Sequence, residues 1–219
     1  MAGVEGNIYH CVFEEILKLQ PGSLTEAKKS QIVEKNIGDY IEILYFLGAD
    51  YGKLFKEVKD SIEEIYSWKT KFIDEDNYVY DSREDDLRIR ILQVFSTEKR
   101  FESNKFGLNG IVDVIMECSI ERYSGGAKIE SVQIPFELKT GLGIKGFYHG
   151  QVILYLLMLY ENDLKKAEKL NGLLFYNRLD RLELVKVKGN EIFDLLMRRN
   201  QVVKKIIDMK NQIQKKQFS

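Results

Sequence analysis

The stretch VQIPFELKTGLGIKGFYHGQVILYLLMLY (residues 132–160) decides the fold, because it joins a β-strand to an apolar helix. Side chains alternate across a strand, so Glu137 and Lys139 of IPFELK share one face. Phe136 and Leu138 share the other face. Taken alone, the acid and the amine are most simply a weak ion pair at a solvated strand edge. The rest of the chain must decide between that interpretation and a functional site.

Composition and length indicate one globular domain. The 219 residues are 44% hydrophobic and 31% charged, with a net charge of −1 and only 2 Pro. We expect an N-terminal helical part (1–75), a sheet with an inserted helix (85–190) and a C-terminal amphipathic helix (190–219). No signal peptide is evident, and the longest apolar run (152–160) is too short to cross a bilayer. The sequence therefore predicts an intracellular protein with no membrane partner.

The two cysteines and the charge distribution add two expectations. Cys11 and Cys118 form no CxxC pair and suggest no disulfide framework, which favours a reducing compartment. Residues 178–219 hold eleven Lys or Arg against five Asp or Glu. A basic end permits a polyanionic partner, although a solvated helix face explains the same charges.

Helical patterns fill the first third of the chain. GNIYHCVFEEILKL (6–19) has apolar residues at helical spacing, and Pro-Gly follows it. Ser23 or Thr25 is expected to cap the next helix (26–37). The pattern over 41–72 predicts one broken helix or two helices, with a kink near Gly48 to Gly52. The acidic run DEDNYVYDSREDD (74–86) is most simply a solvated loop.

From Leu87 onward the pattern changes to that of a sheet. Alternating and β-branched segments predict strands, and Gly125-Gly126 is typical of a hairpin turn. Pro135 indicates a strand edge or a bulge. A helix is expected to begin near His149, and the remaining patterns predict a hairpin over 171–188 and a helix over 190–215. This order predicts an α/β fold with helices packed on a sheet.

Asp113 lies mid-strand in GIVDVIM, where a buried carboxylate requires a partner or a metal. A two-residue turn at Gly125-Gly126 would pair Asp113 with Leu138, on the wrong face. A slip of one residue, from an odd loop or a bulge near Pro135, would place Asp113 on the face of Glu137. We therefore predict that slip.

These side chains suit the hydrolysis of phosphodiesters. Asp113, Glu137 and the backbone carbonyl of Leu138 offer the oxygen ligands that Mg²⁺ and Mn²⁺ prefer. Such an ion acidifies water and offsets phosphate charge. Lys139 is positioned to orient the attacking water and to stabilise the transition state.

The same residues resemble a known family. GIVDVIM with Asp113, followed by IPFELKTG with Glu137 and Lys139, is similar to the motif of PD-(D/E)xK nucleases. GQVILY, with Gln151 and Tyr155, resembles the QxxxY motif of the RecB-like branch. GNIYH, with His10, resembles the first motif of that branch. Within the branch, the stretch 98–161 is most similar to the nuclease domain of the eukaryotic helicase–nucleases that trim Okazaki flaps and resect DNA ends.

The resemblance implies a restriction-endonuclease-like core, a mixed central sheet flanked by helices. It also implies that His10 ligates the metal and that Gln151 and Tyr155 position the substrate. Without the resemblance, His10 and Tyr155 would be read as packing residues and Gln151 as a cap. Glu98 is a weaker candidate as an acid near the site. Lys145, Arg178 and Arg181 are weaker candidates for phosphate contacts.

The implied function is a divalent-metal-dependent nuclease acting on single-stranded or flap DNA in replication and repair. A helicase domain or a single-strand-binding protein is the expected partner, and the nucleus the expected location. Many relatives hold a [4Fe–4S] cluster through four cysteines, so none is expected in this chain of two. The chain also has no P-loop motif and is not itself a helicase. The alternatives are a non-catalytic nucleic-acid-binding subunit and a CRISPR-adaptation-type or restriction-like DNase.

Overall fold

The computed structural model describes residues 2–75, 77–81, 84–122, 128–141, 143, 146–167 and 169–217. Helices make up the first third of the chain and are followed by a π-helical turn, η1; their bounds are α1 (Ala2–Leu17), α2 (Glu26–Gly38), α3 (Ile41–Phe46), α4 (Tyr51–Lys69) and η1 (Thr70–Asp74). The Thr25 hydroxyl caps α2 by accepting a hydrogen bond from the Lys28 N–H. Gly48, at φ +66°, lies in the break between α3 and α4, as the sequence predicted.

A six-stranded sheet follows, in the order β1 to β6; the strands are β1 (Tyr78–Asp81), β2 (Glu84–Ser103), β3 (Leu108–Arg122), β4 (Lys128–Lys139), β5 (Asn171–Tyr176) and β6 (Arg181–Lys186). All neighbours are antiparallel except β4 and β5, which are parallel. The parallel pair requires a crossover, which α5 (Gly146–Leu159) and the short α6 (Leu164–Ala167) provide. The predicted mixed sheet flanked by helices is therefore confirmed.

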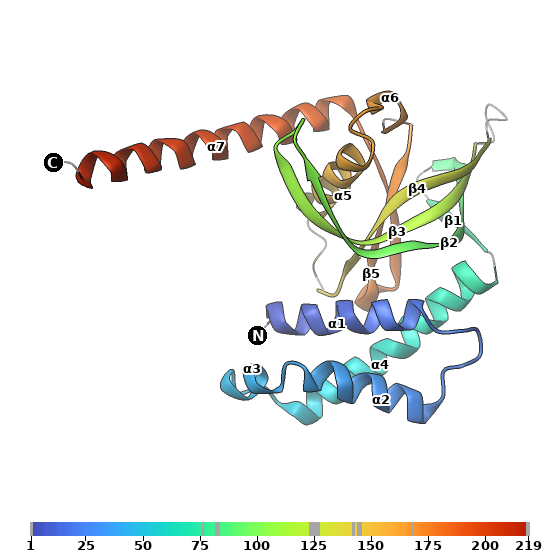
Figure 1. Ribbon diagram of the computed structural model, residues 1–219. Coiled ribbons are helices and arrows are strands. Elements are labelled where there is room, and N and C mark those ends of the chain that lie inside the picture. Colours follow the sequence, from blue (N-terminus) through green and yellow to red (C-terminus); the bar gives the residue numbers. More distant parts are fainter. Residues whose placement is uncertain are drawn as a thin grey trace.

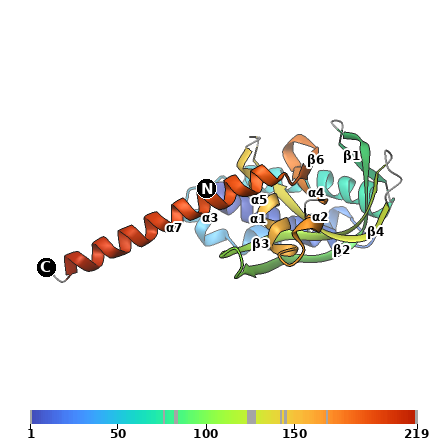
Figure 2. The same cartoon turned by 90° about the horizontal axis from the view of Figure 1, so that it is seen from above.

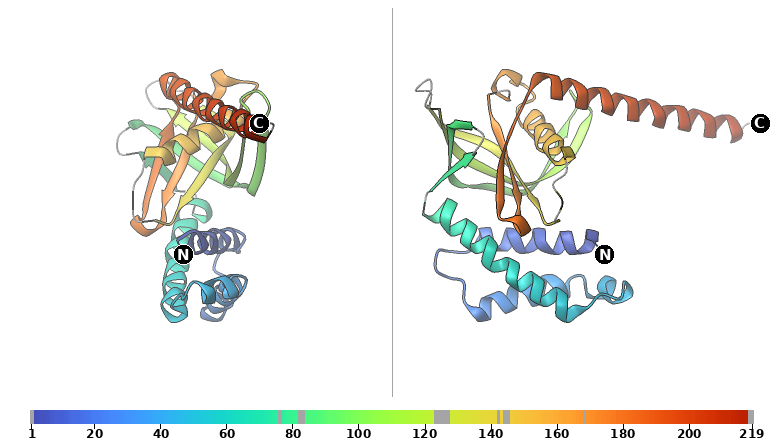
Figure 3. Two further views of the ribbon diagram at one scale, coloured as in Figure 1. Left: turned by 90° about the vertical axis from the view of Figure 1, so that its left-hand side faces the viewer. Right: turned by 180° about the vertical axis from the view of Figure 1, so that it is seen from behind.

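The two faces of the sheet meet different helices. In Figures 1 and 3, α5 lies within the curve of the sheet, whereas α1 and α4 lie beyond the opposite face. Phe136 of β4 packs on the α1 and α4 side, with ring centres 5.4 Å from Phe13 and 5.0 Å from Trp68. Glu137 and Lys139 alternate with Phe136 along β4 and therefore belong to the α5 side.

One local expectation was wrong, and a second was confirmed only in part. The acidic run 74–86 is not simply a loop, because it contains β1, which pairs with β2 and buries Val79. Pro135 is not at a bulge, since it pairs with Ile115 in regular register, but it does lie at a local edge, where the described β5 pairing has not yet begun. Proline is tolerated there because β4 pairs with β5 only from Phe136 onward. The expected turn at Gly125-Gly126 lies outside the described residues.

The C-terminal helix α7 (Gly189–Gln217) leaves the body of the protein after its first turns (Figures 1 and 2). Leu195 packs close to Gly150 of α5. Further along, Val202, Ile206 and Met209 are each more than half exposed. Among the described helices, none is both long and apolar enough to cross a membrane.

Candidate metal and phosphodiester site

The register of β3 and β4 brings the two predicted carboxylates level. Val114 pairs with Phe136, which places Asp113 beside Glu137 rather than Leu138. The predicted one-residue slip is therefore confirmed, but its expected position near Pro135 was wrong. The register changes where β4 has two residues (130 and 131) opposite the single residue of β3 between Cys118 and Ile120.

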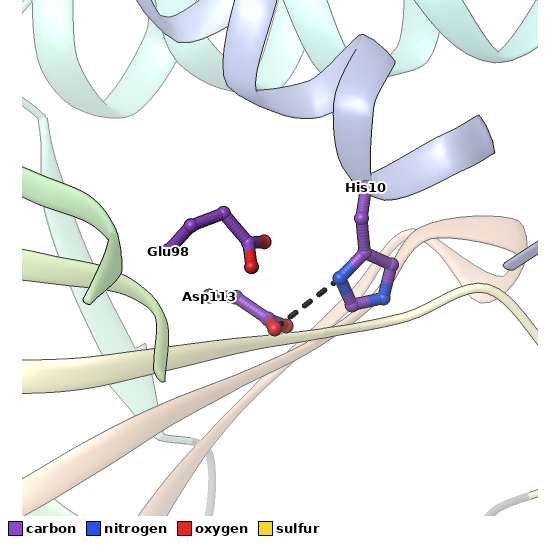
Figure 4. A group of neighbouring side chains, drawn as sticks. All are labelled: His10, Glu98 and Asp113. Carbon is purple, nitrogen blue, oxygen red and sulfur yellow. Dashed lines mark ion pairs between the residues drawn. The ribbon is translucent and has the colours of Figure 1, made fainter. Parts of the chain in front are cut away.

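Three side chains from three elements converge at this point. One ligand atom each of His10, Glu98 and Asp113 lies within 4.8 Å of the other two. Figure 4 shows the imidazole reaching down from α1 toward the carboxylates of β2 and β3. His10 Nδ1 lies 3.2 Å from Asp113 Oδ1. An imidazole with two carboxylates is a suitable partial ligand set for a divalent ion.

Asp113 also fixes the end of the β3–β4 ladder. Its second carboxylate oxygen accepts a hydrogen bond of 2.8 Å from the Leu138 N–H. One oxygen is thus held by the backbone of β4, while the other faces His10. The carboxylate is therefore oriented by the sheet itself.

Glu98 reaches the site through an unusual backbone conformation. It lies between Thr97 and Lys99, which pair with Val114 and Val112, so it is level with Asp113. Its φ of +46° is in the left-handed region that non-glycine residues seldom adopt. Strain of this kind is often found at functional sites.

A hydrogen-bonded chain on the other side of Asp113 links β4 to α5. Lys139 Nζ lies 2.5 Å from Glu137 Oε1 and 2.9 Å from the side-chain oxygen of Gln151. Gln151 donates to the Tyr155 hydroxyl at 2.8 Å, and that hydroxyl donates to the Ile111 carbonyl at 2.6 Å. Gln151 and Tyr155 therefore hold the lysine rather than merely filling the core.

The electrostatics reveal an excess of negative charge. Burial, followed by the charge of Asp113, raises the pKa of Glu137 to about 7. Partial burial and the same charge raise the pKa of Glu98. Burial acts to lower the pKa of His10, but the hydrogen bond and charge of Asp113 outweigh it, so the pKa is raised. A cation placed among these groups would relieve their mutual repulsion.

Glu137 has room for a further partner. The residue is only 1% exposed, and its Oε2 atom has no hydrogen-bond partner among the described residues. A buried carboxylate oxygen without a partner is costly. This orphaned oxygen fits a site completed by a bound cation.

The weaker sequence candidates lie in different positions. The Arg178 guanidinium is already engaged, 3.3 Å from the Tyr9 hydroxyl and 3.5 Å from a Glu57 oxygen. Arg181 pairs with the buried Glu183. Lys145 lies outside the described residues, and the role of the Leu138 carbonyl as a ligand stays a prediction.

Sequence reasoning also missed a neighbour of the lysine. The Tyr148 ring centre lies 4.7 Å from Lys139 Nζ. The sequence did indicate this neighbour, because Tyr148 lies shortly before Gln151, at the start of the same helix. His149, expected at the helix start, lies 2.7 Å from a Glu183 oxygen.

Comparison with known proteins identifies the family. The family model described as DNA replication factor Dna2 matches residues 1–118, more than half of the chain. The chain belongs to the Dna2 family. The matched part contains His10, Glu98 and Asp113.

Relatives of the Dna2 family extend the match over most of the chain. The DNA replication ATP-dependent helicase/nuclease JHS1 of Arabidopsis thaliana is 26% identical over 213 residues, covering 92% of this chain and 15% of the relative. The DNA replication ATP-dependent helicase/nuclease DNA2 of Homo sapiens is 26% identical over 219 residues, covering 88% of this chain and 20% of the relative. The DNA2 protein of Gallus gallus is 25% identical, covering 87% of this chain and 21% of the relative. The chain thus spans about a fifth or less of the length of these Dna2 relatives.

Proposed function

We propose that this chain is a divalent-metal-dependent nuclease that hydrolyses phosphodiester bonds of single-stranded or flap DNA in replication and repair. The observation that carries the proposal is the convergence of His10, Glu98 and Asp113 within 4.8 Å of one another. The Glu137–Lys139 pair lies near enough for the charges of Asp113 and His10 to act on Glu137, and it offers an acid and an ammonium beside this cluster. The names of the relatives, helicase/nucleases of DNA replication, agree with this activity.

The metal would be Mg²⁺ or Mn²⁺, held by His10, Asp113 and Glu137, with Glu98 as a further carboxylate. When bound, such an ion lowers the pKa of water and neutralises charge on the phosphate. Oxygen ligands suit both ions, and the imidazole of His10 favours Mn²⁺.

The remaining groups act on the water and the phosphate. Lys139, fixed by Glu137 and Gln151, orients the attacking water through its ammonium and stabilises negative charge as it develops on phosphorus. As the water oxygen bonds to phosphorus and loses a proton to the solvent, the bond to the leaving sugar oxygen breaks and that oxygen takes up a proton from the solvent. Tyr155 and Gln151 contribute by keeping the ammonium in place.

The partners and location follow from the same proposal. A helicase domain or a single-strand-binding protein would supply the unpaired strand, in the reducing interior of the nucleus. Phosphate contacts would make DNA binding weaken as salt rises.

The test compares cleavage of labelled single-stranded and flap DNA by wild type, Glu137→Gln and Glu34→Gln, in Mn²⁺, in Mg²⁺ and in EDTA. Glu34 is an exposed glutamate of α2 and provides the matched control. We expect metal-dependent cleavage by wild type and Glu34→Gln, and none by Glu137→Gln. Binding without cleavage in either metal would instead support a non-catalytic nucleic-acid-binding subunit.

A second measurement separates metal binding from chemistry. Calorimetric titration of Mn²⁺ into wild type and Glu98→Gln should give weaker binding in the variant. Equal affinity would remove Glu98 from the ligand set.

A further inference from the structure

We propose that Phe147 and Tyr148, at the start of α5, form a subsite that stacks one unpaired nucleobase beside the cleavage centre. This inference rests on the proposed nuclease function and specifies its substrate: a strand whose bases are free to leave the stack. We call the ring series Tyr176, Tyr148 and Phe147 the aromatic ledge.

The aromatic ledge begins at the catalytic lysine and ends in solvent. The Tyr148 ring centre lies 4.7 Å from Lys139 Nζ and 6.2 Å from the ring centre of Tyr176. Phe147 meets Tyr148 edge to face, with ring centres 4.5 Å apart and planes at 67°. Tyr176 is fully buried, whereas Phe147 is 66% exposed. The ledge therefore connects the interior beside Lys139 to an accessible ring.

Sheet register places a cation at the far end of the same row. Lys139 of β4 pairs with Tyr176 of β5, which pairs in turn with Arg181 of β6. Arg181 and His149 both contact the buried carboxylate of Glu183, at 2.5 Å and 2.7 Å. Their side chains are still 48% and 37% exposed. A phosphate next to a base on the ledge would thus meet the half-exposed guanidinium of Arg181, whose charge is shared with Glu183.

Aromatic rings interleaved with cations are the usual means of binding single-stranded nucleic acid without regard to sequence. A base within a duplex already uses both faces for stacking, so only an unpaired base gains from the ledge. Exposure alone does not carry this inference, since Tyr45 and Phe46 of α3 are each 87% exposed. What distinguishes Phe147 is its contact with Tyr148 and, through that ring, with Lys139.

The first experiment tests the ledge by changing both the DNA and the protein. Single-stranded oligonucleotides carry one abasic residue at successive positions, and cleavage is mapped to the nucleotide for wild type, Phe147→Ala, Phe147→Trp and Phe46→Ala. In wild type, we expect cleavage to fall about tenfold or more at one fixed offset from the abasic residue. Phe147→Ala should cleave all of the oligonucleotides more slowly than wild type, and the extra loss at that one offset should disappear. Phe147→Trp and Phe46→Ala should behave like wild type.

The second measurement does not require cleavage. Stacking on an aromatic ring quenches 2-aminopurine, so its fluorescence in a single strand bound in EDTA should be higher with Phe147→Ala than with wild type. Thermal melting checks that the variants are folded, as expected for a largely exposed side chain.

The possible results separate the two proposals. Cleavage that ignores the abasic residue in wild type, with equal quenching by wild type and Phe147→Ala, would overturn the ledge and leave the nuclease standing. No cleavage at all, with quenching that depends on Phe147, would overturn the nuclease and support the ledge as a base-binding site. No cleavage, together with quenching that does not depend on Phe147, would overturn both proposals.

Discussion

Lys139 donates a hydrogen bond of 2.9 Å to Gln151, so the helix α5 holds the ammonium that β4 presents to the site. Glu137 holds the same ammonium from within β4. Two supports from different elements leave Lys139 little rotamer freedom, which is the property that a group acting on a transition state needs.

Gln151→Leu should therefore lower the cleavage rate by about 10- to 100-fold, as loss of a supporting partner commonly does. The effect should fall on kcat and leave DNA affinity nearly unchanged. Gln201→Leu, at an exposed position on α7, is the matched control. Equal rates for wild type and Gln151→Leu would show that Glu137 alone positions the lysine.

The raised pKa of Glu137 predicts how the stability of the metal-free protein depends on pH. Between pH 4.5 and about 7 the unfolded chain has lost the Glu137 proton, while the folded protein retains it. The folded state therefore binds more protons in this window, and its stability falls as pH rises, by up to about 3 kcal/mol. Denaturant titrations at pH 5 and pH 7.5 measure this loss.

Glu137→Gln should remove most of that dependence. Some should remain, because the raised pKa of His10 gives stability that is present below pH 6.5 and is lost as the ring deprotonates in the folded state. An unchanged slope in Glu137→Gln would exclude Glu137 as its source.

His10→Ala should change the preference between metals. Removing the imidazole leaves oxygen ligands only, so affinity for Mn²⁺ should fall more than affinity for Mg²⁺. Calorimetric titration with each ion gives both affinities. His149→Ala, at the only other histidine, should change neither; a similar loss of Mn²⁺ affinity there would mean that His10 is not the ligand.

Gly172 of β5 lies directly against the Val152 side chain of α5. A methyl group at this position would overlap the Val152 side chain and lie 3.3 Å from Pro135 Cγ. Gly172→Ala should lower the free energy of unfolding by about 1–3 kcal/mol through overpacking. Val152→Ala in the same protein should recover part of that loss. Additive losses in the double variant would show that the two positions do not compete for space.

Periodicity predicted most of this architecture. The spacing of apolar residues along α1 and the cap at Thr25 are local properties, and the structure reproduces them. The position of Asp113 on the same face as Glu137 was also predictable. A register shifted by one residue would place the Asp113 carboxylate on the other face, away from its polar partners. The position of the bulge was not, since an extra residue at 130–131 leaves no mark in the alternation.

Two further features were hidden by composition and by backbone geometry. Val79 is buried, but its acidic neighbours in the sequence made β1 read as a loop. The orientation of Glu98 depends on a positive φ that no propensity predicts, and on two register shifts earlier in β2. Both features result from tertiary contacts rather than from local preference.

The hydrogen bond from the Leu138 N–H to Asp113 has a consequence for genetics. An allele that replaces Asp113 with a residue lacking a side-chain acceptor, such as alanine, leaves the Leu138 N–H unsatisfied, a loss of about 1–3 kcal/mol. In a cell, such a loss lowers the amount of folded protein as well as its turnover. A null phenotype at Asp113 would therefore combine a shortage of enzyme with a defect in chemistry. An allele at Lys139 keeps this backbone bond but loses the ion pair with the buried Glu137, so the amount of folded protein measured for each allele is what separates the shortage from the defect in chemistry.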